Sequence, residues 1–184
     1  MTESKRERTR ARLQACALDL FERQGFDATT VAQIAAAAEV TPMTLFRHFP
    51  TKEHLLLDDP YDPLIAAAVT AQPRSLPPLV RIARGIRVAW AQVPEPDSEI
   101  VRRRVRISAL TPSLRAGVAR NGAQTEQLIA AALEADGATT LVARAAAAAA
   151  MGAITAALFE WAVQPELTLA EAVFAAVDLL EGAE

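Results

Sequence analysis

Residues 29–53, TTVAQIAAAAEVTPMTLFRHFPTKE, contain two short helical patterns that a brief turn separates. Thr30 and Gln33 have the spacing of a capping box, which predicts the start of the first helix. Thr41 is a good cap for the second helix, with Pro42 at its first position, where the missing N–H costs nothing. This stretch therefore predicts two capped helices in close succession.

The two helices and the turn between them predict a helix-turn-helix motif. The first helix spans 30–38, the turn is Glu39 and Val40, and the second helix spans 41–48. A left-handed turn would be strained at Glu39, because L side chains disfavour positive φ. The second helix is too short to be stable alone, so its outward face is the candidate reader of a DNA major groove.

An amphipathic helix precedes the motif, from about Arg6 to Gln24, with Gly25 as its cap. The apolar residues with the spacing to pack the motif on this helix are Leu13, Ala17, Leu20, Phe21, Val31, Ile34, Ala35, Val40, Leu45 and Phe49. Basic residues cluster before this helix, and they are either an arm that contacts DNA or a solvated, frayed terminus. The cluster consists of Lys5, Arg6, Arg8, Arg10 and Arg12.

Charge is distributed unevenly along the 184 residues, which carry a net charge of −3. Residues 1–53 contain eight basic and seven acidic residues, whereas the remainder contains 11 and 15. The acidic total therefore does not exclude DNA binding. A single cysteine excludes a disulfide framework, and without a secretory signal it indicates the cytoplasm. Both histidines and the cysteine lie in the first 54 residues, which argues against an enzyme, a metal site or a cofactor.

We expect an all-α fold of about nine helices, since the alternating Val, Ile and Thr typical of strands are absent. The prolines in 58–63 interrupt the helices, and we place a domain boundary there. A three-helix DNA-binding domain would occupy 1–58, and a helical bundle for effector binding and dimerisation would occupy 59–184. The longest uncharged stretch, 145–159, has 15 residues where a bilayer span needs about 20, so we interpret it as a buried helix and expect no membrane contact.

Residues 10–57, RARLQACALDLFERQGFDATTVAQIAAAAEVTPMTLFRHFPTKEHLLL, resemble the DNA-binding domain of TetR/AcrR-type bacterial transcriptional regulators. The motifs at the family spacing are Gly25-Phe26, Thr29-Thr30-Val31, Thr44-Leu45-Phe46, and Phe49 with Lys52-Glu53. Two positions depart from the family pattern. Glu39 stands where a glycine is usual, and Phe46 stands where a tyrosine is usual.

The resemblance implies contacts to duplex DNA. Residues 41–44 match the base-facing turn, where Pro42 and Met43 could contact thymine methyl groups only by apolar packing. Lys52 is a cation at a helix N-terminus, which opposes the helix dipole and suggests phosphate as the compensating anion. The implied DNA-binding residues are Thr29, Thr30, Thr41, Pro42, Met43, Thr44, Phe46, Arg47, His48 and Lys52.

The resemblance also implies a homodimer that forms through the last two long helices. Small residues between 145 and 157 would permit close helix approach, although the same surface could pack within the chain instead. The candidate interface residues are Ala149, Ala153, Ile154, Ala157, Trp161, Phe174 and Val177.

An effector pocket is expected between the helices from about 64 to 135. Its candidate lining residues, which solvent could cover instead, are Arg87, Trp90, Arg102, Arg106, Asn121 and Gln124. The arginines between 102 and 106 favour an anionic ligand. Residues 49–73 also resemble regulators related to the mycofactocin-system repressor, and this resemblance implies an acyl-CoA thioester as effector.

These features predict a ligand-responsive repressor that is not an enzyme. A dimer would bind a palindromic operator, and a small molecule, an acyl-CoA or another anionic lipophilic ligand, would release it. The fourth helix, 52–58, would be the lever between the two domains. The alternative is a helical adaptor that binds protein and no effector.

Overall fold

The computed structural model describes residues 4–57, 62–92 and 98–182, and over these residues it contains ten α-helices, one 3-10 helix and no strand. The all-α fold class is confirmed. The chain divides into two compact units. Unit 1 takes Met1–Asp58 and Glu99–Val118, and unit 2 takes Asp59–Ser98 and Ala119–Glu184.

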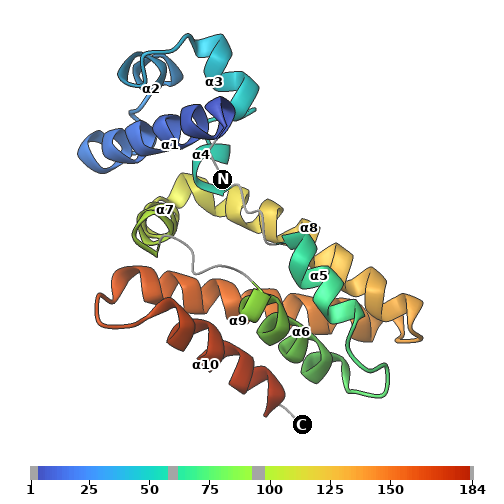
Figure 1. The fold of residues 1–184 in the computed structure, drawn as a ribbon. Coiled ribbons are helices and arrows are strands. Elements are labelled where there is room, and N and C mark those ends of the chain that lie inside the picture. Colours follow the sequence, from blue (N-terminus) through green and yellow to red (C-terminus); the bar gives the residue numbers. More distant parts are fainter. Residues whose placement is uncertain (1–3, 58–61, 93–97, 183–184) are drawn as a thin grey trace. The chain divides into compact units, whose positions relative to one another are not determined.

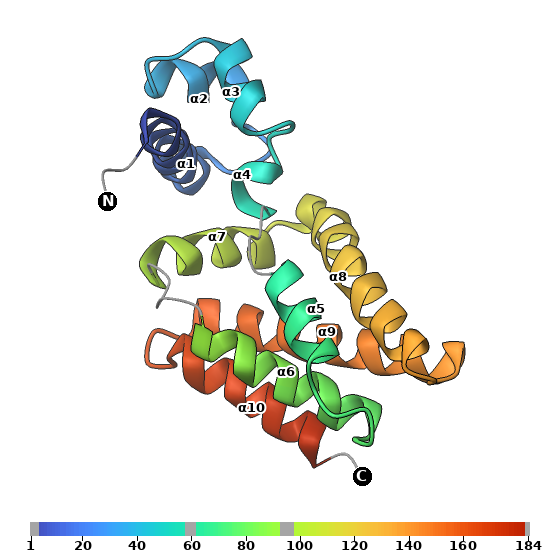
Figure 2. The same cartoon turned by 45° about the vertical axis from the view of Figure 1, so that its right-hand side comes forward.

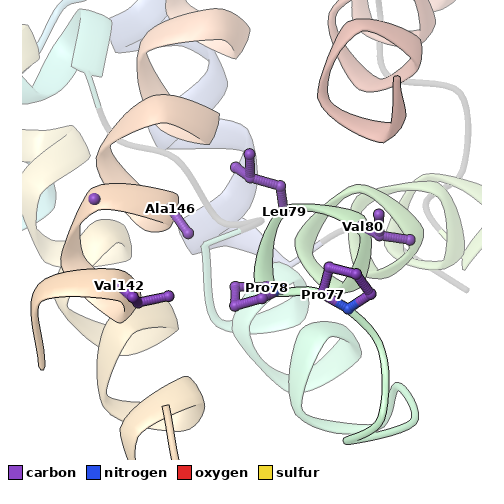
Figure 3. A pocket seen from close by; sticks show the side chains of 7 residues that line it. Pro77, Pro78, Leu79, Val80, Val142 and Ala146 are labelled. Atoms are coloured by element: carbon purple, nitrogen blue, oxygen red, sulfur yellow. The ribbon is translucent and has the colours of Figure 1, made fainter. Parts of the chain in front are cut away.

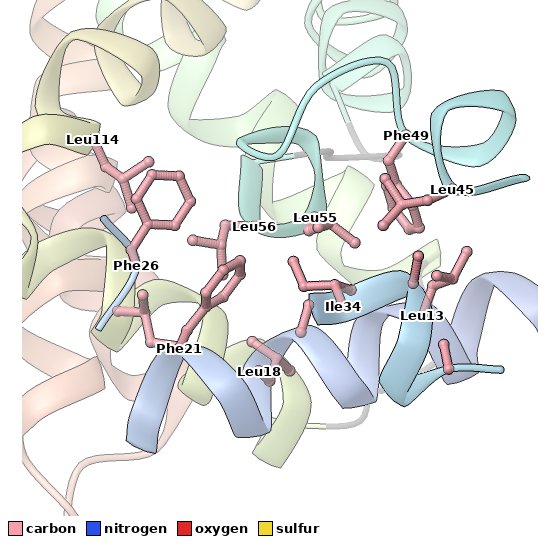
Figure 4. Packing of buried hydrophobic residues seen from close by; sticks show 14 residues of the cluster. Leu13, Leu18, Phe21, Phe26, Ile34, Leu45, Phe49, Leu55, Leu56 and Leu114 are labelled. Atoms are coloured by element: carbon pink, nitrogen blue, oxygen red, sulfur yellow. The ribbon is translucent and has the colours of Figure 1, made fainter. Parts of the chain in front are cut away.

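Unit 1 is built from the helix-turn-helix motif, the helix before it, and a later segment of the chain (Figure 1). Its elements are α1 (Lys5–Gln24), α2 (Val31–Ala37), α3 (Pro42–His48), α4 (His54–Leu57), α7 (Ser98–Leu110) and the 3-10 helix η1 (Pro112–Leu114). The predicted apolar pattern forms its core, where Leu13, Ile34, Leu45 and Phe49 meet with no exposed surface (Figure 4). The predicted packing of the motif on α1 is confirmed.

The turn between α2 and α3 adopts the left-handed geometry that is strained for a residue other than glycine. Glu39 has φ of 53°, the single positive φ of a non-glycine residue among the described residues. Its N–H bonds to the carbonyl of Ala36, and the N–H of Val40 bonds to the carbonyl of Ala35. These two bonds make a Schellman motif, which closes a helix through one left-handed residue and usually employs glycine there.

The basic cluster at the N-terminus is part of α1 rather than an arm before it. Ser4 caps the helix by accepting from the N–H of Glu7, whose carboxylate accepts from the N–H of Ser4 in return. This capping box starts the helix at Lys5, so the five basic residues through Arg12 lie on α1. The predicted first turn was too late because Ser4 was not recognised as the cap.

The division into units differs from the predicted boundary in one segment. Residues 99–118 cluster with unit 1, whereas the prolines in 58–63 predicted a second domain that contains all of 59–184. Ile107 and Leu114 are buried in the same core cluster as Phe21 and Phe26, and Figure 4 shows Leu114 beside Phe26. An apolar stripe on a helix shows that the face is buried, but it does not show against which helix.

Unit 2 contains α5 (Asp62–Thr70), α6 (Pro78–Gln92), most of α8 (Arg115–Ala135), α9 (Thr140–Val163) and α10 (Leu169–Glu181). Helix α6 packs on α5, α9 and α10, and α9 packs on α10 (Figure 2). At Gly85 the backbone of α6 comes so close to Val69 of α5 that an added Cβ would lie 2.7 Å from the Val69 Cα. Only glycine permits this approach of the two helices.

A buried arginine joins three parts of unit 2. The Arg81 side chain is 3% exposed, and its guanidinium donates to the carbonyls of Val69 and Thr70 at 3.1 and 3.2 Å and pairs with Asp136. Asp136 also pairs with Arg74 at 2.7 Å. These bonds tie the end of α5 and the start of α6 to the turn after α8. The buried charges of Arg81 and Asp136 are thereby paired, as a low-dielectric interior requires.

Helix α9 is long and apolar enough to cross a bilayer by length and composition alone. The core of unit 2 accounts for one side of it, where Ala143, Ala147, Ala150 and Trp161 are buried. Core helices commonly meet the same two criteria, so this helix is weak evidence for a membrane span.

Replacing Glu39 by glycine should stabilise unit 1. Glycine removes the strain of a left-handed Cβ in the folded protein, about 1–2 kcal/mol. It also raises the conformational entropy of the unfolded chain, which offsets part of this gain in stability. We expect the free energy of unfolding to rise by about 0.5–1 kcal/mol in urea titrations. The matched control is Ala37→Gly in the last turn of α2, which should lower it by about 1 kcal/mol. A loss of stability in both variants would contradict the strain at Glu39.

Candidate nucleic-acid interface

Helix α3 is held against unit 1 by the side chains on its inner face. Leu45 and Phe49, its C-cap residue, are fully buried, and the Thr41 hydroxyl caps the helix by accepting from the N–H of Thr44 at 3.2 Å. This anchoring leaves Met43 69% exposed and Phe46 46% exposed on the opposite face. The predicted outward face of the second helix is therefore present, on a helix whose orientation within unit 1 is set by packing.

Cations gather at the C-terminal end of α3. Arg10 donates to the backbone carbonyl of His48 at 2.9 Å, and its guanidinium lies 4.2 Å from the centre of the Phe49 ring. Burial, and then the charges of Arg6, Arg10 and Arg47, lower the pKa of His48 below its ordinary value. A lowered pKa favours the neutral imidazole, so the arginines supply the positive charge at this end of α3.

The two threonines before α2, Thr29 and Thr30, differ in the exposure of their side chains to solvent. The Thr29 side chain is buried, donates to the carbonyl of Gly25 at 2.7 Å and lies 3.1 Å from Nε2 of Gln24. Its hydroxyl therefore stabilises the turn after α1. Thr30 is exposed and caps α2 by accepting from the N–H of Gln33 at 3.2 Å, as the capping box predicts. Of the pair, only Thr30 presents its side chain to solvent.

Lys52 has protein partners that its position in the sequence does not reveal. Its ammonium group donates to the carbonyls of Phe26 and Thr29 at 2.7 and 2.9 Å, and lies 4.0 Å from the centre of the Phe26 ring. These carbonyls and the aromatic ring compensate the charge, so a phosphate is not needed to explain the residue. Lys52 joins the segment before α4 to the turn between α1 and α2.

An ionic contact between α1 and α7 was missed by sequence reasoning. Arg103 forms a fork on Glu22, with Nε–Oε1 at 3.0 Å and Nη2–Oε2 at 2.7 Å, and it also pairs with Asp19 at 2.6 Å. Arg106 adds a bond to Glu22 at 3.1 Å. These arginines, Arg103 first, lower the pKa of the Glu22 carboxyl. The arginine-rich run was visible in the sequence, but its acidic partners lie about 80 residues away.

Arg104 of α7 forms hydrogen bonds with the backbone of α4. Its guanidinium donates two bonds to the carbonyl of Leu56, at 2.9 and 2.7 Å, and Gln14 of α1 donates to the carbonyl of Leu55 at 2.9 Å. These bonds satisfy carbonyl groups at the C-terminal end of a four-residue helix. The short helix α4 is thus held by side chains of α1 and α7.

The predicted effector residues do not gather in one place within a unit. Arg87 pairs with Asp178 and with Glu181, and its guanidinium lies 5.3 Å from the centre of the Phe174 ring. Trp90 contacts the same ring edge-on, with centroids 6.1 Å apart. Arg102 and Arg106 belong to unit 1, whereas Asn121 and Gln124 belong to unit 2. Arg87 and Trp90 therefore join α6 to α10, and a common pocket for the six residues stays a prediction.

The predicted dimer residues separate into core and surface. Trp161 and Val177 are fully buried within unit 2, so they cannot contact a second copy, and the prediction is corrected for these two. The hydrophobic pattern identified them as apolar but could not show which side of the helix faced inward. Ala149 is exposed, and Ala153, Ile154, Ala157 and Phe174 are partly exposed.

Comparison with known proteins relates both parts of the chain to regulators. Residues 15–58 match the family model for bacterial regulatory proteins of the tetR family, and residues 76–183 match that for the MftR C-terminal domain. The HTH-type transcriptional regulator TcmR of Streptomyces glaucescens is 34% identical over 137 residues, which cover 71% of the chain. The match spans 61% of the length of TcmR.

Solved structures share the fold. NalD of Pseudomonas aeruginosa, the secondary repressor of the MexAB-OprM multidrug efflux pump, is 25% identical with a TM-score of 0.55, over 95% of this chain and 94% of NalD. The repressor FadR of Thermus thermophilus, in complex with lauroyl-CoA, is 24% identical with a TM-score of 0.50, over 93% and 92% of the two chains.

The lowered pKa of His48 predicts a pH dependence of stability. A histidine whose pKa is lower in the folded protein than in the unfolded chain loses stabilisation as the pH falls below the unfolded value of about 6.5. We therefore expect wild-type protein to lose more stability than His48→Gln between pH 7.5 and pH 5.5, measured by urea unfolding. The difference between the two proteins should be constant above pH 7.5. Parallel losses on acidification would contradict the assignment.

Proposed function

Because the chain belongs to the tetR family of bacterial regulatory proteins, we propose that it is a DNA-binding transcriptional repressor whose operator affinity a small molecule controls. The observation that carries this proposal is the outward face of α3, which is anchored by buried Leu45 and Phe49 and flanked by arginines. The relatives found are regulators, and we propose no catalytic activity. Such a regulator acts on the chromosome, in the cytoplasm.

In this proposal, α3 lies in the major groove of the operator. Met43 and Phe46 face the bases, with Pro42 and the Thr41–Thr44 pair beside them. Arg47 and Thr30 are exposed at positions suited to the phosphate backbone. His48 lies beside the same phosphate backbone, and its lowered pKa favours the neutral imidazole. Thr29 and Lys52 stabilise the helix-turn-helix and α1, which together form the proposed reading head, through their bonds to backbone carbonyls.

We further propose a homodimer formed by α9 and α10. On α9, Leu141 is 79% exposed and Val163 is 45% exposed, and Leu179 of α10 is 68% exposed. Between the two α9 residues, the exposed positions include Ala148, Ala149 and Gly152, which permit close helix approach. A surface this apolar is typical of a protein interface. Two copies would place two reading heads on the halves of a palindromic operator.

The proposed effector class is an acyl-CoA or another anionic lipophilic ligand, as the resemblance to mycofactocin-system regulators implies. The match of residues 76–183 to the MftR C-terminal domain supports it. Unit 2 also has an open apolar pocket of about 500 Å³, lined by Pro77, Pro78, Leu79, Val80, Val142, Ala145 and Ala146 (Figure 3). The start of α6 and one face of α9 form its walls. Such a lining suits a hydrocarbon chain.

Release of the operator would follow from a population shift. The effector would bind more tightly to a conformation of unit 2 in which the two reading heads have a spacing that does not fit the operator. Its preference for this conformation over the DNA-binding one sets how far the affinity for DNA falls. Helix α4 directly precedes unit 2 in the chain. Arg104 and Gln14 donate hydrogen bonds to the carbonyls at its C-terminal end. We propose α4 as the lever, with α7 moving together with the reading head.

Arg47→Ala should weaken operator binding through the loss of a phosphate contact. Each such contact contributes about one unit to the slope of log affinity against log salt concentration, so we expect the slope to fall by about 1. The probe is duplex DNA from upstream of the protein's own gene, titrated by fluorescence anisotropy at several salt concentrations.

Lys52→Ala is the matched cation variant. Loss of its bonds to two carbonyls should lower the free energy of unfolding by about 2 kcal/mol, while the salt slope of the folded protein stays unchanged. The reverse pattern, a changed slope for Lys52→Ala and an unchanged one for Arg47→Ala, would contradict the proposed division between the two residues.

Leu179→Glu should disrupt the dimer, because the charge would be buried in an apolar interface. We expect sedimentation velocity to give the dimer mass for wild type and the monomer mass for the variant. Leu110→Glu on α7, where the native leucine is 67% exposed, is the matched control and should stay dimeric. A wild-type monomer at micromolar concentration would contradict the proposed interface.

A further inference from the structure

Residues 63–94, which span most of α5 and all of α6, carry only positive charge. They contain four arginines and no acidic residue, although the chain has a net charge of −3. Three of these arginines pair with acidic residues of unit 2, namely Arg74, Arg81 and Arg87. The fourth, Arg84, is exposed, and within the described residues no hydrogen bond or ion pair engages its side chain. Arg84 is therefore available to a ligand.

Arg84 lies beside the open apolar pocket of unit 2. Val80, one of the residues that line this pocket, precedes Arg84 by four positions, so the two share a face of α6. Helical side chains lean toward the N-terminus of their helix, which places the Arg84 side chain over the turn that contains Val80. A positive charge consequently borders a pocket whose lining residues are all apolar.

The walls of this pocket come from two helices. Figure 3 shows Val142 and Ala146 of α9 opposite Pro78 and Leu79 of α6, and the volume is about 500 Å³. None of the lining residues has a polar side chain, so a polar side-chain contact to a bound molecule has to come from the rim. The group available there is the guanidinium of Arg84, and a guanidinium binds a carboxylate through two parallel hydrogen bonds.

We propose that the pocket and Arg84 together bind a fatty carboxylate, with its hydrocarbon chain in the pocket and its carboxylate on Arg84. This inference rests on the proposed function and narrows the proposed effector class to one chemistry. Charge complementarity favours the free acid, because one cation meets one negative charge. An acyl-CoA would instead bring an uncharged thioester to the rim, and its charges lie on phosphates farther along the molecule. A neutral hydrocarbon would leave Arg84 unused.

Decanoate and 1-decanol separate the two parts of the site, because they have the same chain length and differ in charge. Isothermal titration calorimetry on the full chain at pH 7.5 should show decanoate binding about tenfold more tightly, since a hydrogen bond to a charged group contributes about this much. Shorter carboxylates should bind about fourfold more weakly for each methylene group removed.

Variants assign each part of the ligand to its residue. Arg84→Gln should lower the affinity for decanoate about tenfold and leave that for 1-decanol unchanged. The matched control is Arg144→Gln, since Arg144 is also exposed but lies two residues from both Val142 and Ala146, on the other side of α9. This control should bind decanoate as wild type does. Ala145→Phe should fill the pocket and weaken the binding of both molecules, and circular dichroism can verify that this exposed position tolerates the ring.

Several results would overturn the proposed site. Equal affinities for decanoate and 1-decanol, or full affinity of Arg84→Gln for decanoate, would contradict the assignment of the carboxylate to Arg84. If neither molecule binds, because a second copy covers the pocket or for any other reason, the whole site is overturned. Tighter binding of decanoyl-CoA than of decanoate would overturn the choice of the free acid in favour of a thioester.

The regulatory role has a separate readout. Decanoate should weaken the binding of wild type to duplex DNA from upstream of its own gene, and Arg84→Gln should need about tenfold more decanoate for the same effect. If decanoate binds in an Arg84-dependent way but leaves the DNA affinity unchanged, the site stands and its effector role is overturned. If no DNA binds, the proposed function fails, while calorimetry still decides whether the carboxylate site exists.

Discussion

A helix of seven residues is not stable in water by its own hydrogen bonds, so everything that α3 presents to the outside depends on what it buries. Leu45 and Phe49 are that anchor, and both are fully buried in the core to which α1, α2 and α4 also contribute side chains. Because these two side chains occupy the inner face, Met43 and Phe46 can only point outward. The candidate DNA-reading surface is therefore a consequence of core packing, and its orientation within unit 1 is as rigid as that core.

Charged side chains stabilise the fold of this protein, in addition to the DNA contacts that we propose for some of them. Lys52 holds two backbone carbonyls, Arg103 forks onto Glu22, and Arg81 is enclosed with Asp136. Each long side chain joins segments far apart in the sequence. This explains why the cations of the chain cannot all be counted as phosphate ligands. Exposed Arg47 is the residue that we propose for that role, beside His48, whose pKa is lowered by burial and by the neighbouring arginines.

Local features of the fold were readable in advance because their causes are local. The capping boxes, the start of α3 at Pro42 and the strain at Glu39 each involve residues within five positions of one another. The error at the N-terminus was also local, since Ser4 and Glu7 form a capping box that places the basic residues on α1. The interaction partners of residues 99–118 were not readable, because helical periodicity identifies a buried face without naming the surface that covers it.

The sequence by itself determined that the chain is all-helical, that residues 30–48 form a helix-turn-helix, and which side chains that motif turns outward. Caps, turn residues and periodicity specify these features over a few residues. The tertiary structure alone decided that α7 belongs to unit 1, that the Lys52 ammonium group is bonded to backbone carbonyls, and that Trp161 and Val177 lie in the core of unit 2. Those outcomes depend on contacts between distant segments, and such contacts form only when the core closes.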